Sequence, residues 1–548
     1  MPPLIMKHNN NNPNELRPSP LDQPPVSLPV LSSSQAEFSR RQFLEATGFT
    51  LSMATLGGCY RPAEQKALPF AVQPAGEIPG RMKYYASTCS GCSASCGLLI
   101  GTRDGRPLKM EGMPKHPLSA GGLCAVGQAV PMGLYDSQRL NGPLMSGKTS
   151  EWSEVDQQIT SKLQKIKSTS GRVRMVTSTV TSPTLQATID GFLNQFSDGQ
   201  HVVLDAVSSS AILDAHQQTH SVRVLPHYLF DRAKVIVSFG ADFLGTWISP
   251  VEYTATWRTR RVPTEDNPTM SYMVQFESRM SLTGSNADRR YGIRPEEQGA
   301  LVGRLAEKIS TLAGMAQSLA PENVAPYENQ EEVLDDLAAR LWKTRGESLV
   351  VSDSQDVQVQ VLMNYINHLL GNYGQTIDIQ RPSRQRQGND REVAKLIEEL
   401  NDGKVNALLV TGTDLSHNLP NRKTLADAVA NVPLVVSFAD RVDDFASLAG
   451  FVCPDHHPLE SWMDAEPVDG LVSLAQPTLH PLRNTRSILE SLTAWSSQQE
   501  KAYDILRATW RTQIFALSKQ DKDFESFWNQ SLHDGFVEIK PRSVRRNS

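Results

Sequence analysis

The segment Cys89-Ser-Gly-Cys-Ser-Ala-Ser-Cys-Gly97, joined further along the chain by an isolated Cys124, decides how the rest of this sequence is interpreted. It offers four thiolates, Cys89, Cys92, Cys96 and Cys124, three of them from one short loop rich in Gly and Ser. A cubane cluster needs ligands from several directions, and small residues let the backbone approach its inorganic sulfides. We therefore expect these four cysteines to hold one [4Fe–4S] cluster.

Two other uses of the four cysteines remain as alternatives. Structural zinc sites usually pair their cysteines as two CxxC knuckles, and the isolated Cys124 does not complete a second knuckle. Disulfides are common in exported chains, but Cys89 and Cys92 lie too close in sequence to bridge without strain. The spacing therefore favours the iron–sulfur cluster over both.

The residues around the loop predict a small β-rich domain over 83–145. Residues 97–112 indicate two strands that are joined by a tight turn at Asp104-Gly105, because Asp-Gly between apolar runs is a strong hairpin signal. The cluster loop would then lie at one end of this domain.

The chain before the loop contains predicted targeting signals. Residues 1–38 are dominated by Asn, Pro, Ser and Gln, and such a composition is typical of disorder. In residues 39–59, Arg40 and Arg41 precede a short apolar stretch, which predicts a twin-arginine export signal. The alternative is an amphipathic surface helix that begins with two arginines.

The end of this segment predicts a lipid anchor. Leu56-Gly-Gly-Cys59 resembles the box at which bacterial lipoproteins are cleaved and acylated, so Cys59 is a candidate lipidation site that would tether the chain to the membrane surface. A cleavage region with an incidental cysteine is the alternative. Residues 60–82 would form a linker.

Apolar runs alternate with helical patterns after the cluster domain, which predicts parallel α/β layers. We expect a first α/β domain over 146–330 and a second over 331–450. Residues 451–495 are expected to form a loop or cap region, and residues 496–548 a helical tail.

Two predicted strands end in the same short pattern. One runs into Gly240-Ala-Asp242, and the other runs into Gly412-Thr-Asp414. Open α/β sheets bind ligands at the carboxyl ends of their strands, so each turn is a candidate cofactor-binding position facing a nucleotide-like group. A plain strand-to-loop turn is the alternative at each position.

Residues 453–466 concentrate polar side chains. His456, His457, Glu460 and Asp464 suggest either a metal or acid/base site or a structural network. Adjacent histidines point in different directions on a strand or a helix, so the pattern favours a structural network or an interface.

Composition excludes some broad classes. The chain has 548 residues, a net charge of −5, 39% hydrophobic and 21% charged residues, which describes a globular protein without the basic footprint of a nucleic-acid binder. No stretch of 18 apolar residues is present, so we expect no membrane-spanning helix.

Several stretches resemble the molybdopterin oxidoreductase superfamily. More closely, they resemble the molybdopterin oxidoreductase-like subunit of alternative complex III, a quinol:electron-acceptor oxidoreductase. It covers 39–495, through the export leader, the four-cysteine frame, and the segments 240–253, 281–288 and 454–462.

This resemblance implies an α/β fold with a small β-rich N-terminal [4Fe–4S] domain and Rossmann-like parallel α/β domains. It implies a subunit of a membrane-associated quinol-oxidising complex on the periplasmic side, which itself holds no catalytic site. The partners it implies are a ferredoxin-like multi-cluster iron–sulfur subunit, a quinone-binding integral membrane subunit and a c-type cytochrome. Because the sequence has no CxxCH motif, covalent haem is expected in another chain.

Some residues depart from the family pattern. Active molybdenum enzymes commonly have a basic residue two positions after the fourth cysteine, where this chain has Val126. The spare thiol, Cys453, is far from where a metal-ligating cysteine is expected. We therefore expect no bound molybdopterin, as in quinone reductase complexes whose large subunit keeps one cluster but no molybdenum. A periplasmic enzyme that depends on molybdopterin guanine dinucleotide is the alternative.

Overall fold

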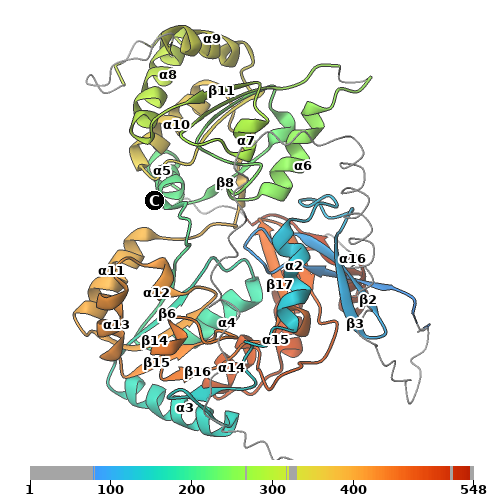
Figure 1. The fold of residues 1–548 in the computed structure, drawn as a ribbon, viewed down its shortest axis with the longest axis vertical. Coiled ribbons are helices and arrows are strands. Elements are labelled where there is room, and N and C mark those ends of the chain that lie inside the picture. The colour runs from blue at the N-terminus through green and yellow to red at the C-terminus, as the bar shows by residue number, and fades with distance from the viewer. Residues whose placement is uncertain are drawn as a thin grey trace, which may run out of the picture. The chain divides into compact units, whose positions relative to one another are not determined.

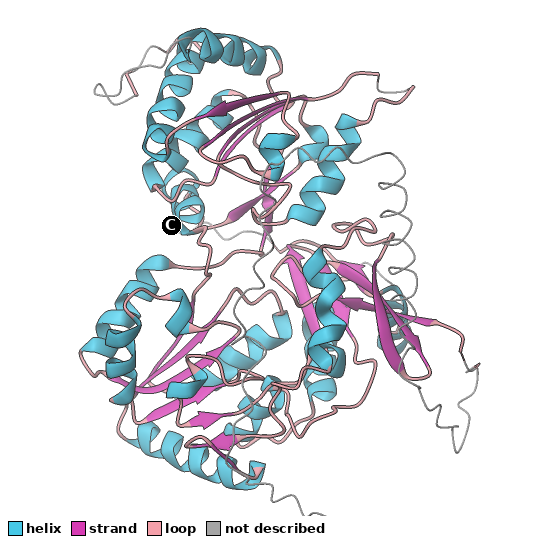
Figure 2. Cartoon of the chain, in the orientation of Figure 1, coloured by secondary structure: helices cyan, strands magenta, loops and turns pink. Residues whose placement is uncertain are grey.

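Four β-sheets and the helices packed on them make up the described part of the chain (Figures 1 and 2). This computed structural model describes residues 78, 80–265, 268–315, 318–319, 330–518 and 523–542. The predicted segments 1–38 and 39–59, with Arg40, Arg41 and Cys59, lie outside the described residues. No helix among the described residues has the length and apolar character needed to cross a bilayer.

The predicted N-terminal hairpin is confirmed. The antiparallel strands β1 (Lys83–Thr88), β2 (Gly97–Arg103) and β3 (Arg106–Gly112) form one small sheet, and helix α2 (Ala125–Leu134) contacts β3. Asp104 and Gly105 have φ angles of 52° and 73°. Two successive left-handed residues are the geometry that a two-residue hairpin turn requires.

A seven-stranded sheet has helices on both faces. Along β6, Val173 and Met175 join the core beneath one helical layer, whereas Val176 joins the core on the opposite face. Such alternation follows from the two-residue repeat of a strand. One face is covered by α3 (Trp152–Ser168), α4 (Pro183–Leu193) and α14 (Ile488–Trp495), the other by α11 (Asp390–Asn401) and α13 (Arg422–Ala430). In spatial order the strands are β5 (Lys148–Thr149), β4 (Leu144–Met145), β16 (Phe451–Val452), β15 (Leu434–Ser437), β14 (Val405–Thr411), β6 (Arg172–Thr177) and β7 (Asp198–Val203).

A parallel four-stranded sheet forms the second α/β layer system. Its strands are, in order, β11 (Arg289–Gly292), β10 (Tyr272–Glu277), β9 (Val235–Phe239) and β12 (Ser348–Ser352). One face packs with α8 (Gln298–Leu312), α9 (Gln330–Lys343) and α10 (Val357–Leu369), the other with α5 (Ser210–His220) and α6 (Pro250–Arg261). The short helices α7 (Leu282–Ser285) and α12 (Leu415–Asn418) follow strands β10 and β14.

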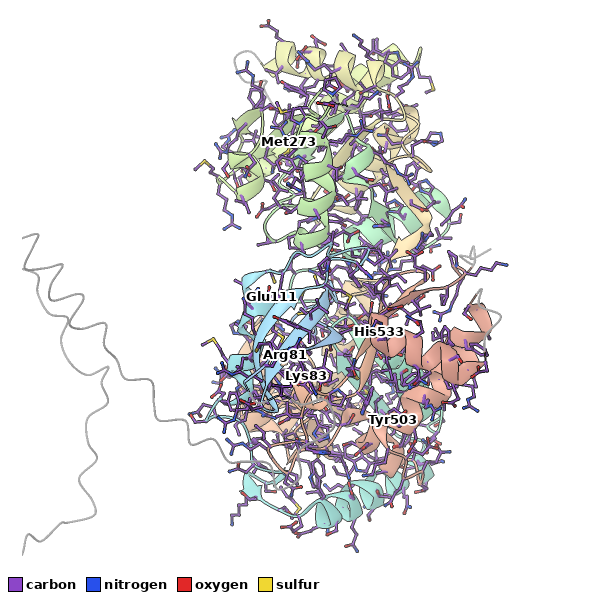
Figure 3. All side chains as sticks on the ribbon, turned by 90° about the vertical axis from the view of Figure 1, so that its right-hand side faces the viewer. Arg81, Lys83, Glu111, Met273, Tyr503 and His533 are labelled. Carbon is purple, nitrogen blue, oxygen red and sulfur yellow. The ribbon has the colours of Figure 1, made fainter. Side chains whose placement is uncertain are left out.

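An antiparallel five-stranded sheet joins the cluster domain to the C-terminal segment. Its order is β19 (Phe536–Glu538), β18 (Leu471–Ala475), β17 (Met463–Val468), β13 (Ile377–Ser383) and β8 (Leu225–Tyr228), with α15 (Ala502–Thr509) and α16 (Phe524–Asp534) nearby. Both β18 and α16 contact β1. Figure 3 shows Lys83 on β1 and His533 on α16, with Tyr503 on α15 below them and Met273 in the four-stranded sheet above.

The sheets divide the sequence differently from the predicted domains. The seven-stranded sheet contains β6 and β7 from the predicted domain 146–330 and β14 and β15 from the predicted domain 331–450. Strand β12, which also belongs to 331–450, lies in the four-stranded sheet instead. Val173 pairs with Ala407 and Met175 with Leu409 in parallel register, so matching apolar faces join distant segments. The predicted cap region 451–495 also differs from expectation, because β17 and β18 within it are central strands of the five-stranded sheet.

Candidate functional site

The cysteine loop folds back on itself. The Cys89 N–H donates to the Cys96 carbonyl over 2.8 Å, and the Gly91 N–H donates to the Cys89 sulfur over 3.4 Å. Cys89 and Cys96 are buried, Cys124 is half-buried and Cys92 is exposed. Backbone N–H groups directed at sulfur stabilise thiolates and tune the potential of a cluster that they ligate.

The four thiols lie close enough to interact electrostatically. Burial raises the pKa of Cys89 to about 11, partly offset by the Gly91 hydrogen bond, and the charges of Cys92 and Cys124 raise it further. Burial also raises the pKa of Cys96, with contributions from the other three thiols. Deprotonating Cys89 and Cys96 therefore requires a strongly cationic partner, which iron ions supply.

A single metal ion does not match this arrangement. Among the described residues, no three His, Cys, Asp or Glu side chains are spaced to hold one ion. A tetrahedral zinc site needs all four sulfurs about 2.3 Å from one centre. The donor chemistry, four thiols from one loop and the start of one helix, is that of an iron–sulfur cluster.

The fourth cysteine begins a helix. Cys124 is the N-cap of α2, whose partial positive charge at the N-terminus favours a thiolate. A Cβ on Gly127 would collide with the Leu123 side chain, so glycine leaves room for Leu123 beside the first turn of the helix.

A buried histidine fixes the end of the loop. The His116 Nε2 lies 3.0 Å from the Ser473 Oγ on β18, and its Nδ1 lies 3.3 Å from the Ser119 Oγ. A Cβ on Gly97 would come within 2.5 Å of the His116 ring, so only glycine fits there. Burial lowers the pKa of His116 to about 4, which keeps the ring neutral.

A cavity of about 570 Å³ opens beside the cluster loop. Its walls include Cys89, Cys92 and Ser93 from the loop and residues 177–182 after β6. Further lining comes from Thr411 and Gly412 at the end of β14, and from Asp205, Val207, Arg386, Asp455 and Asp464. This first cavity therefore lies at the carboxyl ends of parallel strands, where α/β sheets bind ligands.

A second cavity, of about 600 Å³, lies at the corresponding ends of β9, β10 and β12. Its walls include Gly240, Asp242, Glu277 and Asp353. Val207 and Arg386 line both cavities, so the two spaces meet at these residues.

The structure brings three of the four Gly-x-Asp residues to these cavities. Gly240 and Gly412 have φ angles of 74° and 67°, a left-handed conformation that suits glycine. Asp242 lines the second cavity, but its carboxylate also accepts hydrogen bonds from the Thr283 N–H and Oγ1. Asp414 lines neither cavity, because it caps α12 through the Ser416 and His417 N–H groups.

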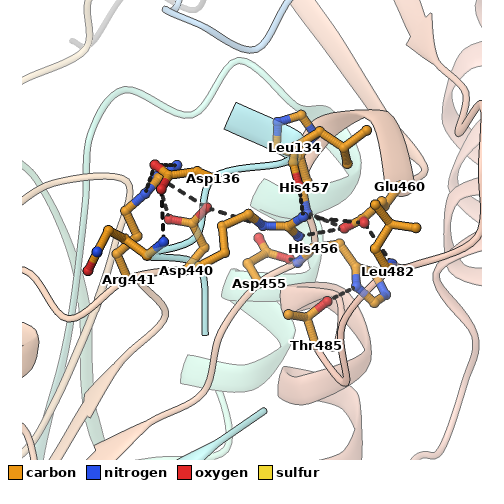
Figure 4. A network of polar contacts seen from close by, with 12 residues as sticks. Leu134, Asp136, Asp440, Arg441, Asp455, His456, His457, Glu460, Leu482 and Thr485 are labelled. Carbon is orange, nitrogen blue, oxygen red and sulfur yellow. Dashed lines mark hydrogen bonds and ion pairs between the residues drawn. The ribbon is translucent and has the colours of Figure 1, made fainter. Parts of the chain in front are cut away.

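The predicted His/Glu/Asp group forms a structural network, shown in part in Figure 4. Glu460 pairs with Arg139, the His456 Nδ1 lies 2.7 Å from the Thr485 Oγ1, and the His457 Nδ1 accepts the Leu459 N–H. Asp464 lies apart from them and accepts hydrogen bonds from Ser182, Thr184 and Trp510. These side chains do not converge on one ion, since no such group exists among the described residues.

Sequence reasoning missed the residues that shape the cavities. The hydroxyl-rich run 177–182 directly follows a predicted strand, and that position could have marked it as a cavity wall. Val207 and Arg386 belong to no motif, and only the fold places them together.

Comparisons with known proteins agree with this geometry. Residues 82–136 match the molybdopterin oxidoreductase Fe4S4 domain. The chain is 24% identical over 457 residues to the menaquinone reductase molybdopterin-binding-like subunit of Nitratidesulfovibrio vulgaris, covering 76% of this chain and 65% of that protein. It therefore spans slightly less than two thirds of that relative's length.

A solved structure shares the fold. Acetylene hydratase from Pelobacter acetylenicus superposes with a TM-score of 0.59 and 13% sequence identity, covering 83% of this chain and 74% of that one. The predicted fold class is confirmed: an α/β protein with a small antiparallel N-terminal domain at the Fe4S4 match and parallel-stranded sheets behind it.

Proposed function

We propose that this chain, a molybdopterin oxidoreductase-like subunit with an Fe4S4 domain, is the electron-transfer and scaffold subunit of a membrane-associated quinol-oxidising complex of the alternative complex III type. It would hold one [4Fe–4S] cluster through Cys89, Cys92, Cys96 and Cys124, and no molybdenum. One observation carries the proposal: the four thiols gather at a loop beside the first cavity, and the two residues that this cavity shares with the second, Val207 and Arg386, offer no metal ligand.

The junction argues against molybdenum through its side chains. A metal held by ligands in both cavities would lie where they meet, and the residues shared there are Val207 and Arg386. Val207 has no donor atom, and a guanidinium stays protonated and has no lone pair to give. Asp205, which lines the first cavity, already accepts hydrogen bonds from the Thr179 N–H and hydroxyl and from the Gly388 N–H.

The cluster's chemistry would be transfer of one electron at a time, and the chain's own residues set the conditions for it. The buried Cys89 and Cys96 would hold the cluster away from water, while the exposed Cys92 would leave it accessible to a partner subunit. His116 stays neutral and holds the loop against β18 without adding charge.

The link to quinone rests on the relative described above, which is named as a menaquinone reductase subunit. The proposed partners are those that the family resemblance of the sequence implies: a ferredoxin-like multi-cluster iron–sulfur subunit, a quinone-binding integral membrane subunit and a c-type cytochrome. Export through Arg40 and Arg41 and acylation of Cys59 would place the assembly on the periplasmic side of the membrane.

The two cavities favour a second function, that of a catalytic subunit that binds molybdopterin guanine dinucleotide. Two cavities of about 570 and 600 Å³ at strand ends, with Gly240, Asp242 and Gly412 in their walls, have room for nucleotide-like groups. A catalytic subunit that uses molybdopterin guanine dinucleotide would need both of them.

Metal analysis of the intact complex, purified without oxygen, separates the two functions. We expect about four iron atoms per copy of this chain from its cluster, beyond those of partner subunits, and no molybdenum or released pterin nucleotide. Stoichiometric molybdenum with a pterin nucleotide would establish the second function instead. A copy of this chain without iron would refute both.

Electron flow tests the direction of the reaction. Menaquinol added to the oxidised complex should reduce the cluster of this chain, as seen in its electron paramagnetic resonance signal. A complex whose reduced cluster is oxidised by menaquinone, and which menaquinol leaves oxidised, would be a quinone reductase instead.

A further inference from the structure

Arg386 connects the cluster loop to both cavities. Its Nη1 donates to the Ser93 Oγ and, over 2.8 Å, to the Gln385 carbonyl, and the Ser93 Oγ donates to the same carbonyl over 2.6 Å. Ser93 directly follows Cys92 in the cluster loop. The guanidinium is therefore fixed one hydrogen bond away from the segment that carries three of the four thiols.

The charge of Arg386 is not neutralised by a carboxylate. No ion pair joins it to an Asp or Glu among the described residues, and its two hydrogen bonds both go to neutral oxygens. Arg384, two residues earlier in the same segment, differs because its Nη2 lies 2.7 Å from an Asp469 carboxylate oxygen.

The other charged groups near Arg386 and the thiols are engaged by partners of their own. Among the described residues that line the first cavity Arg386 is the only cation, and the three carboxylates there, Asp205, Asp455 and Asp464, accept hydrogen bonds from other donors. On the thiol side, the charge of Glu252 acts on Cys96, but Glu252 is hydrogen-bonded to the His227 Nε2 at 2.5 Å.

We propose that Arg386 is a positioning residue that stabilises the reduced form of the cluster and so raises its reduction potential. This inference rests on the proposed function, because it requires a cluster at the four cysteines. Reduction adds one negative charge at the thiolates and their iron, and an unpaired guanidinium beside the loop lowers the free energy of that state. The hydrogen bond to Ser93 keeps the charge in place.

Redox titration of the anaerobically purified complex, followed by the paramagnetic signal of the reduced cluster, tests this assignment. Arg386→Gln should lower the ratio of reduced to oxidised cluster at a given potential about tenfold, which is 59 mV for one electron. Arg386→Lys keeps a positive charge and should retain most of the wild-type potential.

Arg279→Gln is the matched control. Arg279 lines only the second cavity and is exposed, so its removal should leave the potential unchanged. A shift equal to that of Arg386→Gln would show a general charge effect and overturn the assignment.

The other possible outcomes distinguish a failure of this inference from a failure of the proposed function. An Arg386→Gln complex with an intact signal and the wild-type potential overturns this inference while the proposed function stands. Equal shifts in the Gln and Lys variants also overturn it, because they show that side-chain contact rather than charge matters. Loss of the cluster in Arg386→Gln and Arg386→Met but not in Arg386→Lys supports it, since the thiolates then need the charge. A wild-type chain without any cluster refutes the proposed function itself.

Discussion

Arg139 and Glu460 form an ion pair with both side chains fully buried, although 321 residues separate them in the sequence. The Arg139 Nη2 lies 2.7 Å from the Glu460 Oε2, and the Arg139 Nη1 also donates to the Leu134 carbonyl at the end of α2. Because α2 begins at Cys124, this pair secures the far end of the helix that presents the fourth thiol.

Breaking this pair should destabilise the protein strongly. Glu460→Gln leaves the buried guanidinium with only the partly exposed Asp440, 3.9 Å from its Nε, as a counter-charge, and breaking a buried pair costs about 3–5 kcal/mol. The free energy of unfolding, from urea titration followed by tryptophan fluorescence, measures it. Arg422→Met is the control, since Arg422 and its partner Asp444 are 60% and 48% exposed and such pairs contribute about 0–1 kcal/mol. Equal effects of the two changes would contradict the role given to burial.

Gly97→Ala should loosen the cluster domain from β18. The new Cβ would lie 2.5 Å from the His116 ring, which has no free space to move into because it is 1% exposed. Overpacking of this kind typically costs about 1–3 kcal/mol. Limited proteolysis and the unfolding free energy should both show the loss.

Gly191→Ala provides the comparison for that experiment. Gly191 lies within α4 and nothing lies within 4 Å of the position of its Cβ. Alanine there should stabilise the protein by about 0.5–1 kcal/mol. A destabilised Gly191→Ala, or an unaffected Gly97→Ala, would show that the packing around these two glycines is not as described.

Serine in place of any one of Cys89, Cys92, Cys96 or Cys124 should lower the iron content and remove the wild-type paramagnetic signal, because a hydroxyl is a poor substitute for a thiolate. Cys453→Ala tests whether the effect is specific, since Cys453 is fully buried in a separate core cluster. It should keep the iron and the signal. Iron lost equally from Cys453→Ala would point to general unfolding.

Stability should depend on pH through Asp455. Burial raises the pKa of Asp455 from its ordinary value of 3.8 to about 7, with smaller contributions from Asp440 and Glu490. Between pH 4 and 7 the folded protein keeps a proton that the unfolded chain has released, so stability falls as pH rises through this range. The slope is on the order of 1 kcal/mol per pH unit.

Asp455→Asn removes this slope and keeps the shape of the side chain. The Asn oxygen can still accept the His456 and Ile488 N–H groups that the Asp455 Oδ1 accepts. Urea titrations at several pH values should therefore show the variant gaining stability over the wild type as pH rises from 4 to 7. Parallel profiles for the two proteins would contradict the raised pKa.

Local features of the fold were predictable because their signals are local. The Asp104-Gly105 turn defines its hairpin, and the strands that became β6, β9 and β14 are short apolar runs. Which strands pair was not predictable, since any two buried parallel strands present similar apolar faces. Arg174 on β6 and Glu399 on α11 form a buried ion pair across 225 residues, and no sequence pattern connects them.

In the candidate site, too, only the features with a local sequence signal were predictable. The cysteine spacing predicted the cluster loop, because one short segment carries three of its thiols. The pair Val207 and Arg386 could not be predicted, because the junction between the cavities exists only once the two parallel sheets have formed.

The partnership between β6 and β14 sets an order of events during synthesis. A ribosome completes β6 and β7 long before β14, the strand that pairs with β6 on its other edge, has been translated. Until then the edge of β6 that pairs with β14 has no strand partner for its backbone N–H and C=O groups, and such an open edge can pair with another chain. A message with a premature stop before residue 405 would yield half a sheet and no stable product.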